Sequence, residues 1–290
     1  MSKILNGKEI SRKIEENLRN KIAEQKMHPK LVIIQIGNKE ESNTYIKHKM
    51  AFAEKIGVIV EYKKYDEAAK EELITSDIRK YNDDTSVHGI IVQLPMPHQI
   101  SANRVLEAIS REKDVDGLTS GSINILLRNE PGFVSGATKA VLTLLDGEGV
   151  ELTGKKVLIV GHSALVGRPT ALALMNRNAT VTVCHEFTKN LSEETRQAEI
   201  VITAVGQPRL ITAAHVTPKQ IIIDIGITVT SDKKIVGDVD YENVKEIVTA
   251  ITPVPGGVGP ITIACLFENV VEACGMRGTM LSNKKVESFG

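Results

Sequence analysis

The sequence predicts an α/β protein of two domains, each a mostly parallel β-sheet covered by helices. Short apolar strand patterns alternate with helical patterns along almost all of the 290 residues, which implies parallel strands connected by helices. A glycine-containing turn follows strand 156–160 and opens a helix, as in Rossmann-type nucleotide-binding domains. We expect a first domain at 1–146, a Rossmann-type domain at 147–260, a substrate cleft between them, and a C-terminal helix near 261–280 that packs back on the first domain.

The first domain begins with a helix over 7–26, because Ile10, Ile14, Leu18 and Ile22 recur at helical spacing on a charged background. Its strands are short apolar runs bounded by turn residues, and prolines stop the last of them. The elements expected after the first helix are strand 31–37, helix 42–56, strand 58–62, helix 68–81 and strand 87–93.

The second domain repeats this alternation after a linking helix over 137–146. Each strand is again a short apolar or β-branched run, and helical patterns lie between the strands. The expected strands are 156–160, 180–184, 199–203 and 220–225, with helices from near 166, 191 and 213 and a final helix over 260–274.

Residues 252–260 contain three prolines and three glycines, which excludes a regular helix or strand. Apolar runs flank this segment at 247–251 and 261–267. The context predicts a stiff loop between a buried strand and a buried helix. The bare backbone of such a loop lets a flat ligand lie against the chain, although a purely structural turn has the same composition.

The composition excludes several classes of partner. Lys+Arg and Asp+Glu number 36 each, so no net charge attracts nucleic acid or an anionic membrane. Aromatic residues make up only 3% and Trp is absent, which argues against base-stacking platforms. No apolar run approaches about 18 residues, so we expect no membrane span.

The N-terminus and the cysteines predict a cytoplasmic protein. The first residues carry neither a secretory nor a transit pattern. Cys184, Cys265 and Cys274 are odd in number and lack CxxC spacing, which is typical of reduced thiols. The seven histidines are scattered without ligand spacing, so we expect no metal site.

The turn after strand 156–160 is a candidate dinucleotide site. Gly161, Ser163 and Gly167 form the pattern Gly-x-Ser-x-x-x-Gly where a pyrophosphate would meet a helix N-terminus, although many structural turns look similar. Glu186, at the end of the next strand, is placed to bind the adenosine ribose and would repel a 2′-phosphate; it is otherwise a solvated loop residue. Later strand ends also carry glycines where a cofactor crosses a sheet edge, at Ala204-Val205-Gly206 and before Ile227.

Helix 42–56 carries candidate catalytic side chains. Ser42 suits its N-cap, and Tyr45 and Lys49 are four residues apart, hence on one face. A tyrosine ring beside an ammonium group fits a flat aromatic substrate with a proton to move, whereas an exposed helix face is the alternative. Gln93 ends a strand where loops build sites, and in Lys113–Leu118 one of the two aspartates, Asp114 and Asp116, can turn outward and the other inward.

Together these segments resemble the bifunctional methylenetetrahydrofolate dehydrogenase/methenyltetrahydrofolate cyclohydrolase family. The order and spacing of the motifs match over residues 3–275. The motifs are Ser42-x-x-Tyr45-x-x-x-Lys49, Gly89 to Pro97, Lys113 to Leu118, Val166 to Pro169, Gly237-Asp238-Val239 and Thr252 to Pro260.

The resemblance implies oxidation of 5,10-methylenetetrahydrofolate with NAD or NADP, then hydrolysis to 10-formyltetrahydrofolate, in one-carbon metabolism. It implies that Lys49 is the central catalytic group, that Gln93 orients it, that Tyr45 stacks on the aminobenzoyl ring and that Asp116 binds the pterin edge. Further folate contacts are implied for Ser42, Leu94, Pro95, Pro255, Gly256, Gly257 and Gly259. Cofactor contacts are implied for Gly161, His162, Ser163, Val166, Gly167, Glu186, Ala204, Val205, Gly206, Ile227 and Thr262.

The chain departs from the family pattern in two places. Residues 135–138 read Ser-Gly-Ala-Thr where the family usually has Pro-Cys-Thr-Pro near the nicotinamide, and losing two prolines should loosen this stretch. His162 and Glu186 replace groups that favour the 2′-phosphate in NADP-using members, so we expect NAD to be slightly favoured.

Three other functions stay open at this stage. The first is a folate-binding or regulatory homologue with impaired dehydrogenase activity, which the altered 135–138 stretch suggests. The second is a dehydrogenase that lacks cyclohydrolase activity, and the third is a Rossmann dehydrogenase acting on an amino or shikimate-like acid. The resemblance also implies a homodimer formed through the nucleotide-binding domain.

Overall fold

The computed structural model describes residues 2–287, with side chains to Met276, and these form two compact units. The three-stranded unit contains residues 13–125, 131–134 and 263–287. The six-stranded unit contains residues 2–12, 126–130 and 135–262. Helix α1 (Gly7–Glu24) begins in the six-stranded unit and continues in the other.

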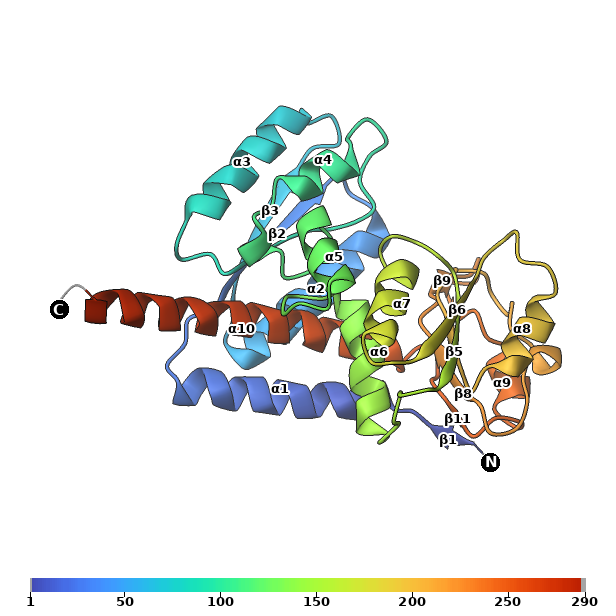
Figure 1. Ribbon diagram of the computed structural model, residues 1–290. Helices are drawn as coiled ribbons and strands as arrows, with labels where there is room; N and C mark the ends of the chain where they lie inside the picture. Colours follow the sequence, from blue (N-terminus) through green and yellow to red (C-terminus); the bar gives the residue numbers. More distant parts are fainter. Residues whose placement is uncertain (1, 288–290) are drawn as a thin grey trace. The chain divides into compact units, whose positions relative to one another are not determined.

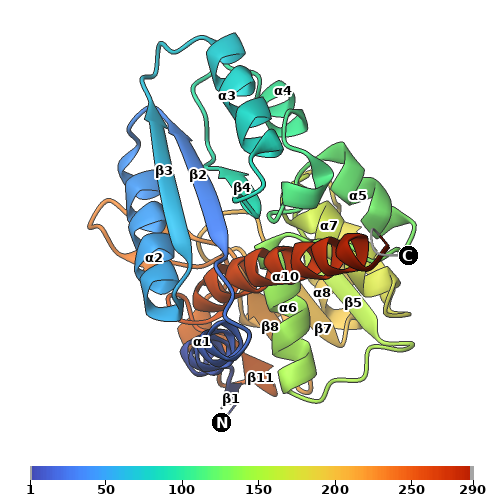
Figure 2. The same ribbon diagram turned by 90° about the vertical axis from the view of Figure 1, so that its left-hand side faces the viewer.

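The sheet of the three-stranded unit is entirely parallel, in the order β3-β2-β4. Alternate residues of its central strand, Val32, Ile34 and Ile36, pack in one core cluster with the apolar positions of α3 and α4. Helix α2 lies on the opposite side of the sheet (Figures 1 and 2). The bounds are β2 (Lys30–Ile36), α2 (Glu40–Ile56), β3 (Ile59–Tyr65), α3 (Glu71–Asp83), β4 (Gly89–Val92), α4 (Ala102–Glu107), η1 (Arg111–Lys113) and α5 (Ser120–Leu127).

In helix α10 (Val258–Glu287), most of the side chains between Val258 and Met276 are buried, and most of the buried ones are apolar. Its segment Val258–Met276 is long and apolar enough to cross a membrane, which the sequence analysis did not foresee, but 56% of that window is buried within the protein. Phe267 stacks on Phe52 of α2 at 5.3 Å between ring centroids. Asn269 donates to the carbonyl oxygens of Val115 and Val134, each at 2.9 Å. From Ile263 onward α10 is thus an integral part of the three-stranded unit.

The sheet of the six-stranded unit is also entirely parallel, in the order β1-β11-β8-β7-β5-β6. Helices α6 and α7 lie on one face, and α8 and α9 lie on the other (Figures 1 and 2). The bounds are β1 (Lys3–Ile4), α6 (Gly136–Gly147), β5 (Lys156–Val160), α7 (Gly167–Met175), β6 (Thr180–Cys184), α8 (Leu191–Gln197), β7 (Ile200–Thr203), η2 (Ala213–His215), β8 (Ile221–Asp224), β9 (Thr228–Val229), β10 (Ile235–Val236), α9 (Tyr241–Val244) and β11 (Ala250–Ile251).

The structure confirms the predicted fold class and corrects two local predictions. Helix α2 begins at Glu40, with Lys39 as its N-cap, so Ser42 is a buried first-turn residue and not the cap. Two glutamates in the first turn favour this earlier start, since they oppose the positive end of the helix dipole. The helix expected near 213 is only the 3₁₀ turn η2, because Val216 after it returns to an extended conformation.

Two segments group with the six-stranded unit, whereas the expected domain boundary at residue 146 would place them with the first domain. The N-terminal strand β1 pairs with β11, and α6 joins α7 through a buried hydrogen bond of 3.1 Å between the hydroxyls of Thr138 and Thr170. The Ser135 hydroxyl caps α6, accepting from the Thr138 amide at 3.2 Å, and it donates to the Thr138 hydroxyl at 3.0 Å. These bonds fix the start of α6.

We expect Ser135→Ala to lower the free energy of unfolding by about 1 kcal/mol, because the variant loses the N-cap and leaves the buried Thr138 amide without it. Chemical denaturation followed by circular dichroism measures the change. Ser231→Ala, at an exposed turn position, is the matched control. Equal stability of both variants would contradict a capping role for Ser135.

Candidate functional site

Lys49 and Gln93 meet in the three-stranded unit. The Lys49 Nζ donates to the Gln93 Oε1 at 3.1 Å, and the Gln93 Nε2 donates to the Leu94 carbonyl at 2.8 Å. The second bond fixes the amide orientation, so the oxygen of Gln93 faces the lysine. Tyr45 lies one turn before Lys49 on α2, and both side chains are half-buried. The structure thus brings together three residues that the sequence analysis selected separately.

A buried polar network holds the first turn of α2 against the sheet. Gln35, 1% exposed at the end of β2, donates to the Asn43 Oδ1 at 2.8 Å and accepts from the Tyr62 hydroxyl at 2.5 Å. Asn43 in turn donates to Asn38 at 3.0 Å. Sequence reasoning missed Gln35, although a glutamine within an otherwise apolar strand was a usable signal.

The loop that carries Asp116 is fixed on both sides. The buried Lys113 ammonium donates to the carbonyl oxygens of Tyr81 and Asp84 at 2.5 and 2.7 Å. Asp114 turns inward and accepts from the Thr119 amide at 2.8 Å and from the Ser122 hydroxyl at 2.6 Å.

Asp116 itself is half-buried rather than fully buried. The pair of aspartates therefore divides as the sequence predicted, with one structural carboxylate turned inward and one that solvent reaches.

Burial and charge set the protonation of Lys49. Burial lowers the pKa of Lys49, and the negative charge of Asp116 opposes this by raising it. Burial also raises the pKa of Tyr45, which keeps its phenol neutral at physiological pH. A lysine with a lowered pKa has a larger fraction of neutral amine, which is the form that accepts a proton.

The β5–α7 turn of the six-stranded unit fits a dinucleotide. Gly161 has φ +114°, and a Cβ at this position would lie 2.6 Å from the Ala204 carbonyl oxygen. A Cβ on Gly167 would lie 2.1 Å from the Gly161 carbonyl oxygen. Only glycine allows this tight passage from strand to helix. The turn therefore has the bare backbone before a helix N-terminus that the binding of a pyrophosphate requires.

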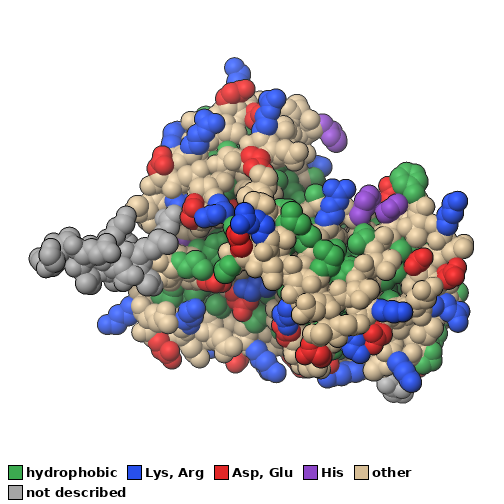
Figure 3. Space-filling model, in the orientation of Figure 1, with side chains coloured by type: hydrophobic (Ala, Val, Ile, Leu, Met, Phe, Trp, Pro, Cys, Tyr) green, Lys and Arg blue, Asp and Glu red, His purple; other side chains and the backbone are tan. Residues whose placement is uncertain are grey.

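Two aromatic residues, His185 and Phe187, flank Glu186 in the sequence next to this turn. The rings of His162 and His185 lie 4.8 Å apart, and that of Phe187 lies 6.0 Å from His185. Figure 3 shows histidine side chains beside hydrophobic ones on the surface of this unit. Glu186 is exposed, so its charge is available to a ligand but is screened by solvent.

The remaining predicted cofactor residues stand at strand ends or at the start of α10. Val205 and Ile227, on the loops after β7 and β8, expose 42% and 44% of their surfaces. Ser163 accepts from the amides of Val166 and Gly167, the N-cap and first residue of α7, at 3.2 and 3.4 Å. Thr262 lies in the second turn of α10, where its hydroxyl donates to the Val258 carbonyl at 3.2 Å.

The loop over residues 252–260, called the Pro-Gly loop below, is packed against the N-terminal segment within the six-stranded unit. The Gly7 amide donates to the Gly256 carbonyl at 3.1 Å, and the Gly257 amide donates to the Pro253 carbonyl at 2.8 Å. The loop joins β11 to α10. It is thus a hydrogen-bonded connection between a strand and a helix, with Pro255 exposed and Gly259 in the first turn of α10.

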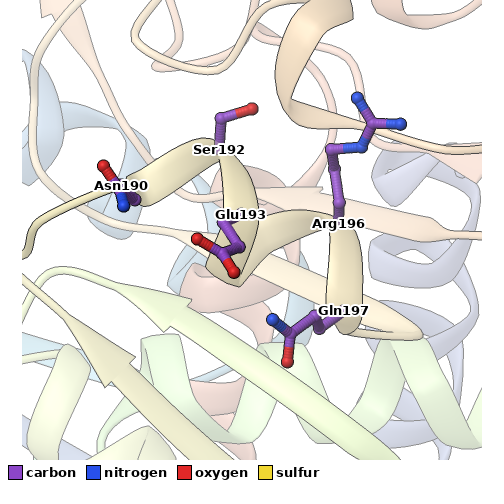
Figure 4. Close-up of a pocket in the computed structure, with 5 residues that line it drawn as sticks. All are labelled: Asn190, Ser192, Glu193, Arg196 and Gln197. Atoms are coloured by element: carbon purple, nitrogen blue, oxygen red, sulfur yellow. The ribbon is translucent and has the colours of Figure 1, made fainter.

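The six-stranded unit has a further surface feature, along α8. Polar side chains line a shallow depression along α8, at Asn190, Ser192, Glu193, Arg196 and Gln197 (Figure 4). The depression contains none of the residues selected above, and most of its side chains are exposed. Among the side chains that the structure describes, up to Met276, no cluster of three or more His, Cys, Asp or Glu has the arrangement of a metal site.

The pH dependence of amine labelling tests the electrostatics of Lys49. We expect the labelling midpoint of Lys49 to lie below the ordinary lysine range of about 10.4. Asp116→Asn should lower it further, because the variant removes the charge that raises the pKa. Peptide mapping by mass spectrometry gives the midpoint, and Glu54→Gln, which removes an exposed carboxylate from the same helix, is the matched control. A midpoint that rises in Asp116→Asn would contradict this electrostatic assignment.

Comparison with known proteins identifies the two halves of the chain. Residues 5–116 match the tetrahydrofolate dehydrogenase/cyclohydrolase catalytic domain, and residues 135–277 match the NAD(P)-binding domain of the same family. A bifunctional FolD protein of Staphylococcus epidermidis (strain ATCC 12228) is 42% identical over 276 residues, which are 94% of this chain and 96% of the relative.

Solved structures agree with this match. The bifunctional dehydrogenase/cyclohydrolase of Campylobacter jejuni has a TM-score of 0.93 and 40% identity, covering 96% of this chain and all of that one. The Trypanosoma brucei enzyme, solved with NADP and an inhibitor, has a TM-score of 0.91 and 30% identity, covering 95% of this chain and 98% of that one. The chain therefore belongs to the tetrahydrofolate dehydrogenase/cyclohydrolase family.

Proposed function

We propose that this protein oxidises 5,10-methylenetetrahydrofolate to 5,10-methenyltetrahydrofolate with NAD(P)⁺ and then hydrolyses the product to 10-formyltetrahydrofolate. The observation that carries the proposal is the contact between Lys49 and Gln93, with Asp116 acting on the lysine charge, in the part of the chain that matches the catalytic domain. The dinucleotide-type turn at Gly161 and Gly167 supports the redox half.

Folate recognition is assigned to the three-stranded unit and the Pro-Gly loop. The half-buried Tyr45 ring offers a stacking face for the aminobenzoyl group, and its neutral phenol adds no charge next to a cationic product. The Asp116 carboxylate accepts two hydrogen bonds from the amino-pyrimidine edge of the pterin. Additional folate contacts are proposed for Ser42, Leu94, Pro95, Pro255, Gly256, Gly257 and Gly259.

The six-stranded unit supplies the cofactor site. When NAD(P)⁺ is bound, its nicotinamide ring accepts the hydride from the methylene carbon of the folate. The Gly161 turn and the start of α7 hold the pyrophosphate. Cofactor contacts are proposed for Gly161, His162, Ser163, Val166, Gly167, Glu186, Ala204, Val205, Gly206, Ile227 and Thr262.

Lys49 promotes the hydrolysis. Its neutral amine, favoured by burial, takes a proton from the water that attacks the methenyl carbon, so that a C–O bond forms as the π pair of the C=N⁺ bond returns to nitrogen. The hydroxyl of this adduct then loses its proton as the C–N5 bond breaks, and N5 keeps a proton, which gives 10-formyltetrahydrofolate. The positive charge of the methenyl folate disfavours an ammonium beside it and acts in the same direction as burial. Gln93 accepts from Lys49 and keeps the amine directed at one position.

NAD is the proposed preferred cofactor. Glu186 carries a negative charge at the end of β6, where an acidic residue binds the ribose hydroxyls and repels a 2′-phosphate. The rings of His162 and His185 lie 4.8 Å apart and are tilted by 34° to each other, and no arginine stands at either position. The exposure of Glu186 limits the discrimination to a modest factor.

The oligomeric state and cell compartment are part of the same proposal. Strand β6 lies at the edge of the six-stranded sheet, and its residue Val183 is 37% exposed. An unpaired edge with an exposed apolar side chain is a surface for pairing with another chain. We propose a cytoplasmic homodimer formed through this unit, and sedimentation at several concentrations measures its mass.

One assay, with purified protein, methylenetetrahydrofolate and either cofactor, distinguishes two rival functions from the bifunctional enzyme. A folate-binding homologue without redox activity would give no reduced cofactor with NAD or NADP. A dehydrogenase without cyclohydrolase activity would accumulate the methenyl product. Production of reduced cofactor followed by decay of the methenyl absorbance supports the bifunctional enzyme.

Lys49→Ala should lose hydrolysis by roughly 10²–10⁴-fold, since this is the usual contribution of a positioned acid–base group, while folate binding is kept. Decay of supplied methenyltetrahydrofolate measures the loss. Lys47→Ala changes an exposed lysine of the same helix and serves as the control. Hydrolysis that persists in Lys49→Ala would show that another group takes the proton.

Glu186→Ser should raise the ratio of kcat/KM for NADP to that for NAD by roughly three- to tenfold, because a screened charge is removed from beside the 2′-phosphate. Glu193→Ser removes an exposed carboxylate of α8 in the same unit and is the matched control. A wild-type protein that strongly prefers NADP would contradict the assignment of Glu186.

A further inference from the structure

The motif Gly237-Asp238-Val239 has no role in the function proposed above, yet its aspartate is fully buried in the six-stranded unit. The Asp238 carboxylate accepts from the amides of Val205 and Gln207, each at 2.8 Å and each on a different oxygen. The nearby amide of Gly206 also lowers the pKa of Asp238. Two amides of the loop after β7 therefore donate to one side chain, one to each oxygen.

A second buried carboxylate holds the segment that carries Asp238. Asp224, the last residue of β8, accepts from the amides of Asp238 and Val239 at 3.2 and 2.9 Å. It also accepts from the Thr203 hydroxyl at 3.0 Å and from the Gly226 amide at 2.9 Å. The ends of β7 and β8 and the Gly237–Val239 segment thus share one acceptor.

The two loops are also in direct contact. The Thr228 hydroxyl donates to the Gly206 carbonyl at 3.0 Å. A Cβ on Gly226 would lie 2.2 Å from the carboxylate of Asp238, so the loop after β8 approaches the aspartate as closely as a glycine allows. Between them the loops present two exposed apolar side chains, Val205 and Ile227.

This arrangement has an electrostatic cost. Burial raises the pKa of Asp224 to about 6, and the nearby charge of Asp238 adds to this rise. Burial also raises the pKa of Asp238. Backbone amide donors offset the cost at both carboxylates, so the loops and the carboxylates depend on each other. Perturbed buried carboxylates of this kind are concentrated at functional sites.

The position of the loops indicates what they serve. In open parallel sheets, ligands bind at the carboxyl ends of the strands, and β7 and β8 continue the sheet on the side of β5 away from β6. In a dinucleotide site the strand pair β5 and β6 receives the adenosine half, so the ends of β7 and β8 receive the nicotinamide half.

We propose that Asp238 and Asp224 are positioning residues that hold the loops after β7 and β8 in one shape, so that Val205 and Ile227 form an apolar seat for the nicotinamide half of the cofactor. This rests on the proposed function. Because the amides of Val205 and Gln207 already donate to Asp238, they do not bind phosphate. The Gly161 turn is then left to hold the pyrophosphate.

Hydrogen exchange and cofactor binding test the proposal in the intact protein. In Asp238→Asn a carboxamide NH₂ replaces one acceptor oxygen and faces a backbone amide donor. We expect faster exchange at the amides of residues 205–207 without cofactor, and a Kd for NAD or NADP raised roughly ten- to hundredfold by calorimetry. The KM for the cofactor should rise more than the KM for the folate. Asp232→Asn, at an exposed turn of the same unit, is the matched control.

A milder pair of substitutions keeps the test decisive if Asp238→Asn does not fold. Val205→Ser removes an exposed side chain from the proposed seat, whereas Val229→Ser removes one that is 46% exposed in β9. We expect only Val205→Ser to weaken cofactor binding.

Each outcome decides between the proposals. Unchanged exchange in Asp238→Asn, or faster exchange with an unchanged Kd, overturns the positioning role, as does equal weakening by Val205→Ser and Val229→Ser. A wild-type protein that binds neither NAD nor NADP instead refutes the proposed function, whatever the exchange result.

Discussion

The six-stranded and three-stranded sheets consist only of parallel strands, whereas the two-stranded sheet of β9 and β10 is antiparallel. The parallel arrangement determines where polar groups are needed. The carboxyl ends of parallel strands lie at one edge of the sheet, where backbone amides leave the ladder and require other acceptors. In the three-stranded unit Gln93 follows β4 and Gln35 lies near the end of β2. In the six-stranded unit Thr203, Asp224 and Thr252 stand at or just after strand ends. The residues that satisfy the backbone are neighbours of those assigned to ligands, because the same edge provides both.

The chemistry of Lys49 depends on a balance between two opposing effects. Burial favours the neutral amine, and the carboxylate of Asp116 favours the ammonium. Burial alone would lower the pKa of Lys49 further and increase the fraction of neutral amine, whereas a close ion pair would hold the lysine charged. Asp116 is also the proposed partner of the pterin. Substrate binding therefore changes the surroundings of the Asp116 carboxylate, whose charge raises the pKa of Lys49 against the effect of burial. The position of the Asp116 loop, fixed through Lys113 and Asp114, is therefore part of the control of Lys49.

Sequence periodicity predicted the two parallel sheets and placed Tyr45 and Lys49 on one helix face, because these features depend on residues close together in the chain. The contact of Lys49 with Gln93, across 44 residues, followed only from the family resemblance and not from spacing. Ser42 was misplaced as an N-cap because α2 begins earlier, at Glu40, where two acidic residues in its first turn oppose the positive end of the helix dipole. Asp238 was noted only as part of a motif, because its amide partners lie 31 and 33 residues away. The way in which the strands pair along the sheet determines the partners of buried polar residues. The local sequence pattern does not contain this information.

The altered stretch 135–138 shows how one constraint replaces another. Prolines stiffen a segment by limiting the unfolded chain, and their absence suggested a loosened start of α6. In the structure, hydrogen bonds in the folded state supply the restraint, through the Ser135 cap and the buried hydroxyls of Thr138 and Thr170. Gly136 adds close packing, since a Cβ there would lie 2.7 Å from the Thr262 carbonyl oxygen. The substitution thus exchanges a restraint on the unfolded chain for contacts in the native unit, and it gives no structural reason to expect a mobile segment beside Thr262.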